Sequence, residues 1–117
     1  MLDLVFTAQQ THRQFHAANE IQMCRLLSIK TGECPENCAY CPQSAHYETG
    51  VDRQQLMDKG TILAAAVQAK NDGATRFCMG AAWRQAPRGE EFESVLESVR
   101  AVADQGIEVC CTLGMLA

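Results

Sequence analysis

The stretch MCRLLSIKTGECPENCAYC (residues 23–41) joins a compact apolar run to three closely spaced cysteines. Its first part, residues 23–32, has an apolar centre and ends at a glycine, which predicts a buried strand. The loop that follows carries Cys34, Cys38 and Cys41 with the spacing C-x₃-C-x₂-C. We therefore expect a strand that delivers three thiols to the loop at its carboxyl end.

The composition indicates one globular domain that binds neither nucleic acid nor membrane. The chain has 117 residues, 47% hydrophobic and 21% charged, and a formal net charge of −4. No block of Lys and Arg supplies the positive surface that nucleic-acid binding needs. No apolar run approaches the ~18–20 residues of a membrane span, and the N-terminus does not resemble a secretory signal. We therefore expect a cytoplasmic location.

The seven cysteines favour metal or thiol chemistry over cross-links, because an odd number cannot form a complete intramolecular disulfide framework. Three thiolates on one loop can hold three irons of a cubane cluster and leave the fourth iron open to a substrate. The alternative is a zinc site completed by a distant Cys or His, with His46 the nearest candidate. Zinc loops usually bring cysteines as pairs, so the triplet favours the iron-sulfur cluster.

Helical and extended patterns alternate along the chain, without repeats or an interdomain linker. We expect helices over residues 4–21, 52–70 (with a break at Gly60-Thr61) and 90–104, and strands over residues 23–32, 75–79 and 107–114. This alternation predicts parallel βαβ units. Because a closed (β/α)₈ barrel needs roughly 200 residues or more, the expected fold is α/β, a partial TIM-type barrel with about three parallel strands and intervening helices.

Two further expectations concern the ends of this pattern. An open three-stranded parallel sheet has exposed edges, so we expect residues 1–117 to be a fragment, the N-terminal part of a single barrel domain.

His12 and His16 lie at i and i+4 on the first expected helix. That spacing can hold a metal, but two solvated histidines are the far commoner reading.

Strand alternation predicts which side chains share a face of the sheet. On the second strand Phe77 and Met79 form an apolar face suited to packing under helices, which leaves Cys78 on the other face. On the third strand Cys111 joins the apolar face and Cys110 the polar one. The expected inner face is Cys24, Leu26, Ser28, Lys30, Arg76, Cys78, Glu108, Cys110 and Thr112. The alternative without a function is that Cys78 and Cys110 are small buried hydrophobic residues.

The cysteine loop and three longer strings carry a resemblance. The pattern C-x₃-C-x-(aromatic)-C, with Tyr40 before the third cysteine, resembles the signature of radical S-adenosylmethionine enzymes. The strings LLSIKTGECPENCAYCPQSAHY, TRFCMGAAW and CTLG are similar to the biotin synthase family in particular. The similarity runs from about Cys24 to Gly114, which is most of the chain.

The resemblance implies an enzyme, a sulfurtransferase that converts dethiobiotin to biotin in the last step of biotin biosynthesis. In that family Cys34, Cys38 and Cys41 would hold a 4Fe–4S cluster whose open iron binds S-adenosylmethionine. Electron transfer then yields a 5′-deoxyadenosyl radical that removes hydrogen from dethiobiotin. The sulfur comes from a 2Fe–2S cluster, whose cysteine ligands correspond by motif to Cys78 and Cys110.

The resemblance also implies roles around the cofactor. Tyr40 would lie near the adenine of S-adenosylmethionine, and the turn Gly80-Ala81-Ala82 near its methionine moiety. Simple strand-to-helix geometry explains that turn equally well. The remaining 2Fe–2S ligands and the residues that hold dethiobiotin would lie beyond residue 117. The implied partners are a reducing electron-transfer protein such as flavodoxin and, at full length, a second copy of the chain in a homodimer.

Two other functions compete with this interpretation. Lipoyl synthase performs related sulfur insertion, but that family carries an additional N-terminal cysteine motif, and no cysteine precedes Cys24 here. The other alternative is a non-catalytic metal- or iron-sulfur-binding module. In either enzymatic case we expect the truncated chain to be inactive alone.

Overall fold

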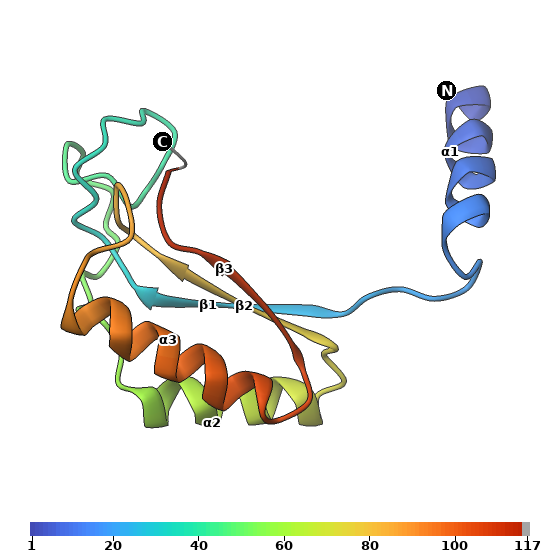
Figure 1. The fold of residues 1–117 in the computed structure, drawn as a ribbon. Helices are drawn as coiled ribbons and strands as arrows, with labels where there is room; N and C mark the ends of the chain where they lie inside the picture. Colours follow the sequence, from blue (N-terminus) through green and yellow to red (C-terminus); the bar gives the residue numbers. More distant parts are fainter. Residues whose placement is uncertain (116–117) are drawn as a thin grey trace.

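The computed structural model describes residues 1–115; the last two residues of the predicted domain, 116 and 117, lie outside that range. Three parallel strands lie in the order β1-β2-β3, and two helices cover one side of the sheet (Figure 1). The elements are α1 (Leu2–Phe15), β1 (Cys24–Lys30), α2 (Lys59–Asn71), β2 (Arg76–Ala81), α3 (Glu90–Ala103) and β3 (Glu108–Thr112). The prediction of an α/β fold with three parallel strands is confirmed, and the sheet is open rather than closed into a barrel. Across residues 1–115, no helix combines the length and apolarity needed to cross a membrane.

The core lies between the sheet and the pair α2 and α3. Phe77 and Met79 on the central strand are fully buried, as is Ile29 near the end of β1. The helices contribute small and branched side chains, which lets them pack closely on the sheet and on each other. The core comprises Ile29, Ile62, Ala66, Ala69, Phe77, Met79, Val95, Val102 and Ile107.

The register of the sheet divides its side chains between two faces. Cys78 pairs with Cys110, and the buried Met79 pairs with Cys111. On the other side of β2, Leu26 pairs with Cys78. Because paired residues of a parallel sheet point the same way, Cys78 and Cys110 lie on the open face, as alternation predicts.

Cys111 departs from its prediction in one respect. It lies on the helix-facing side with Met79, as expected, but it is exposed rather than packed against a helix. The reason is that β3 is an edge strand, with a neighbouring strand on one side only.

The second helix is shorter than predicted. It begins at Lys59 instead of residue 52, because the carboxylate of Asp58 caps it by accepting from the Thr61 amide at 3.0 Å. The preceding residues are extended, since Gln54 exchanges backbone hydrogen bonds with Thr31 at 2.9 and 3.0 Å. The predicted break at Gly60-Thr61 is wrong, because these residues form the first turn of α2.

The first helix ends earlier than predicted, at Phe15 rather than residue 21. The backbone of His16 is extended, and the chain then runs without regular structure to β1. No residue of α1 is buried, and Figure 1 shows this helix standing away from the sheet. The point at which α1 ends is therefore not fixed by packing against the rest of the protein. The rings of His12 and His16 lie 5.2 Å apart, centroid to centroid.

A matched pair of isoleucine substitutions tests the core. Ile29 is fully buried, whereas Ile21 is 85% exposed. Ile29→Val should lower the free energy of unfolding by about 0.5–1.5 kcal/mol, since it removes a packed methylene. Ile21→Val should change it by less than about 0.5 kcal/mol. Urea denaturation followed by circular dichroism measures both, and equal effects would contradict the core described above.

Candidate metal centre

The ends of the parallel strands gather the candidate residues at one edge. The cysteine loop follows β1, and the Gly80–Ala82 segment closes β2. Lys30 is buried and connects the start of the cysteine loop to the end of β2. Its Nζ donates to the carbonyl oxygen of Gly32 at 3.1 Å and to that of Ala82 at 3.5 Å. The Ala82 amide in turn donates to the Lys30 carbonyl oxygen at 3.0 Å. The cysteine loop therefore begins at a fixed point of the sheet's carboxyl edge.

Backbone hydrogen bonds organise the cysteine loop itself. The Cys34 amide donates to the Gln43 carbonyl at 2.9 Å, and the Ala45 amide donates to the Cys34 carbonyl at 2.8 Å. Between these pairings, a turn brings the Cys41 amide within 2.9 Å of the Cys38 carbonyl oxygen. The three thiols are free and partly buried, and none belongs to the core. Tyr40 beside them is 92% exposed.

The donor set of this loop fits an iron-sulfur cluster in number and chemistry, since three thiols are the ligands that a cubane with one open iron requires. In residues 1–115, however, no group of three or more Cys, His, Asp or Glu side chains is arranged around one metal position. The thiols would have to turn toward a common centre when metal binds. Their role as ligands stays a prediction.

The zinc alternative gains no support from His46. Its Nε2 lies 3.0 Å from the Pro35 carbonyl oxygen, so the ring is engaged with its own loop.

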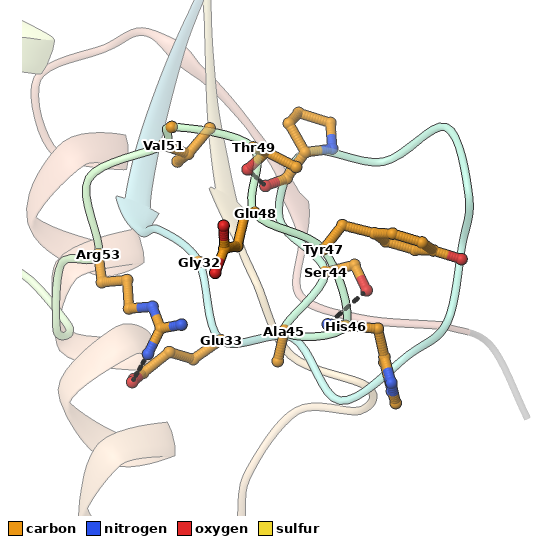
Figure 2. Close-up of a pocket in the computed structure, with 12 residues that line it drawn as sticks. Gly32, Glu33, Ser44, Ala45, His46, Tyr47, Glu48, Thr49, Val51 and Arg53 are labelled. Atoms are coloured by element: carbon orange, nitrogen blue, oxygen red, sulfur yellow. Dashed lines mark hydrogen bonds and ion pairs between the residues drawn. The ribbon is translucent and has the colours of Figure 1, made fainter.

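A polar cavity of about 450 Å³ lies beside the cysteine loop and is lined mainly by residues 42–53, the segment that follows the third cysteine (Figure 2). An ion pair between Arg53 and Glu33, 3.4 Å long, lies at one side of it, and His46 and Tyr47 lie at the other. None of the three loop cysteines lines this cavity. No sequence pattern predicts this cavity; of the candidate metal ligands, His46 of the zinc alternative lines it and the loop cysteines do not.

A second thiol cluster lies on the open face of the sheet. Cys78 and Cys110 are direct cross-strand neighbours. Hydrogen bonding to Cys110, together with burial and hydrogen bonding to Cys24, raises the pKa of the Cys78 thiol to about 12. The three strands thus each bring one thiol to the same region, which is the arrangement that the face argument predicts. Whether Cys78 and Cys110 bind a cluster stays a prediction.

A charged network borders these thiols. Arg76 donates to Glu108 at 2.6 Å, and the same carboxylate accepts from Gln22 at 2.7 Å. Sequence reasoning assigned Arg76 and Glu108 to the inner face without recognising the pair. The opposite charges of these residues could have predicted the ion pair, because the register of the parallel strands places Arg76 beside Glu108.

The Gly80-Ala81-Ala82 segment lies at the carboxyl end of β2. A side chain at Gly80 would meet Leu26 at 3.8 Å, an ordinary contact distance, so local packing does not demand glycine there. Ala82 is buried. The roles of these residues and of Tyr40 at the cofactor stay predictions.

No family model matches the chain. Individual relatives do. The chain is 56% identical over 116 residues to the biotin synthase of Sorangium cellulosum, covering 99% of this chain and 33% of that protein. It is 58% identical over 115 residues to the biotin synthase of Methylibium petroleiphilum, covering 98% of this chain and 34% of that protein. The biotin synthase of Cytophaga hutchinsonii is 53% identical over 116 residues, covering 99% and 34% respectively.

The resemblance to the biotin synthase family is confirmed. The chain spans about a third of the length of the biotin synthases it matches. Its similarity to them includes both the cysteine loop and the two strands that carry Cys78 and Cys110, because the matched region covers nearly all of the chain.

The position of Cys78 beside Cys110 predicts how fast the Cys78 thiol reacts with an alkylating reagent. Because only the thiolate is nucleophilic, the raised pKa of Cys78 should make its alkylation by iodoacetamide slow at pH 8.5. Cys110→Ala removes the largest cause of the shift and should speed alkylation of Cys78 severalfold, as measured by mass spectrometry. Cys111→Ala is the matched control. If it accelerates Cys78 as much, Cys110 and Cys78 do not share a face.

Proposed function

We propose that this chain is the cluster-bearing part of a biotin synthase, a radical S-adenosylmethionine enzyme that inserts sulfur into dethiobiotin. The observation that carries the proposal is the combination of a three-cysteine loop at the carboxyl edge with a thiol-bearing sheet face beneath it. The similarity to named biotin synthases over nearly the whole chain supports the same function.

Cys34, Cys38 and Cys41 hold the 4Fe–4S cluster in this proposal. When bound, that cluster supplies the electron that cleaves S-adenosylmethionine to methionine and a 5′-deoxyadenosyl radical, the species that removes hydrogen from dethiobiotin. The residues of this chain hold the cluster and orient S-adenosylmethionine. The Cys34 backbone pairing and the turn at Cys41 fix the loop, while Tyr40 and the segment Gly80-Ala81-Ala82 flank the bound S-adenosylmethionine.

Cys78 and Cys110 hold the 2Fe–2S cluster that donates sulfur. Metal ligation requires thiolates, and the raised pKa of Cys78 disfavours the thiolate in the metal-free chain. Binding at this face must therefore release protons and become tighter as the pH rises. Arg76, held by Glu108, keeps a positive charge at the border of the resulting anionic site.

The whole enzyme would need partners beyond this chain. We propose a reducing electron-transfer protein such as flavodoxin as the electron donor, a homodimer as the full-length assembly, and the cytoplasm as the compartment. Lipoyl synthase is less favoured, because the relatives are named biotin synthases. A non-catalytic metal-binding module remains the alternative from another functional class.

Anaerobic reconstitution with iron-57 and sulfide tests the loop assignment. The chain should acquire the Mössbauer spectrum of a 4Fe–4S cluster, and S-adenosylmethionine should change the electron paramagnetic resonance spectrum of its reduced form. Cys34→Ser, Cys38→Ser and Cys41→Ser should each abolish the cluster, since each removes one of its three ligands. Cys111→Ser, outside both sites, should leave it. A colourless protein that retains one zinc would favour the non-catalytic module.

The 117-residue chain alone should not convert dethiobiotin to biotin. Helices α2 and α3 lie on one side of the sheet, and no described helix covers the other side (Figure 1), whereas radical chemistry needs a cavity that excludes water. We expect at most weak reductive cleavage of S-adenosylmethionine, detected as 5′-deoxyadenosine by liquid chromatography. Biotin formed by the purified chain would contradict this and would indicate an active site assembled between chains.

A further inference from the structure

One ion pair joins the cysteine loop to the segment that follows β2. Arg84 Nη1 lies 2.5 Å from Glu36 Oε1, and Glu36 stands between the first two cysteines of the loop. The Glu36 side chain is only 21% exposed, against 69% for Arg84. The carboxylate is thus largely covered, whereas the guanidinium is exposed, so solvent screens the pair from the Arg84 side. Glu36 Oε1 is buried and makes no hydrogen bond within the described residues, so this ion pair is what offsets its buried charge.

Both partners are anchored through their backbones. The Glu36 carbonyl oxygen accepts from the hydroxyl of Ser44, which is buried. The Arg84 carbonyl oxygen accepts from the Met115 amide at 2.7 Å. Gly114 packs so closely on this segment that an added Cβ would lie 2.8 Å from the Arg84 carbonyl oxygen. Arg84 is therefore a fixed point between the segments that follow β2 and β3.

We propose that Arg84 is a positioning residue for the cysteine loop: its ion pair with Glu36 holds the loop carrying Cys34, Cys38 and Cys41 at the carboxyl edge of the sheet. Lys30 fixes only the start of that loop, through Gly32. Arg84 adds a second tether within the cysteine stretch itself and joins it to the ends of β2 and β3. The consequence for cluster assembly rests on the proposed function, whereas the tether itself does not.

Hydrogen exchange of the metal-free chain, measured by nuclear magnetic resonance, tests the tether. Arg84→Ala should speed exchange of the loop amides of Cys34, Cys41 and Ala45 by roughly two- to fivefold, the effect of losing a partly covered ion pair. Amides in the buried part of α2 should be unchanged. The double variant Arg84→Glu with Glu36→Arg should restore slow exchange, because it reverses the charges and keeps the pair.

Lys59→Ala is the matched control, since it breaks another ion pair, the 2.9 Å contact between Lys59 and Glu97 on the helices. It should leave the loop amides unchanged. Unchanged loop exchange in Arg84→Ala, equal acceleration throughout the chain, or acceleration of the loop by Lys59→Ala would each overturn the proposal.

A second measurement separates this inference from the proposed function. In the anaerobic reconstitution with iron(II), iron(III) and sulfide, Arg84→Ala should load its 4Fe–4S cluster more slowly than the wild-type chain, and the charge-reversed pair should recover. A wild-type chain that loads no cluster would count against the proposed function, while the exchange experiment, which needs no iron, would still decide the role of Arg84.

Discussion

The in-register parallel pairing of the central strand with its two neighbours is the constraint on which the rest of the structure depends. It aligns Cys78 with Cys110 and Met79 with Cys111, and so sorts one sheet into an apolar face under two helices and an open face with thiols. Because side chains alternate with a period of two, a slip of one residue would exchange the faces. Phe77 and Met79 would then meet solvent, and the thiols would enter the core.

The same pairing creates the candidate metal centre, since parallel strands deliver their following loops to one edge. Lys30 ties the start of the cysteine loop to the end of β2, and Arg84 ties its middle to the same segment. The cysteine loop therefore stands at the carboxyl edge of the sheet that carries Cys78 and Cys110. The function proposed above assigns one iron-sulfur cluster to each of these two groups of thiols, one local in sequence and one assembled from strands.

Sequence reasoning succeeded where the signal is local and periodic. The three strands and α3 were predicted closely, because alternation and helical spacing are fixed by neighbouring residues. The start of α2 was missed although Asp58 is a typical N-cap residue, because the extended segment before it is set by a pairing with Thr31. The exposure of Cys111 and the contact of Arg84 with Glu36 depend on how distant segments pack, which no local pattern reports.

The sheet register is the central claim, and a disulfide comparison tests it most directly. Two variants would each keep Cys78 and one partner, Cys110 or Cys111, with every other cysteine changed to Ser. Adjacent strands lie about 4.8 Å apart, within the range that a disulfide spans. Mild oxidation with diamide, followed by mass spectrometry, should therefore link Cys78 to Cys110 and leave Cys78 and Cys111 unlinked. Ready formation of the bond between Cys78 and Cys111, with none between Cys78 and Cys110, would contradict the register and the two-faced sheet built on it.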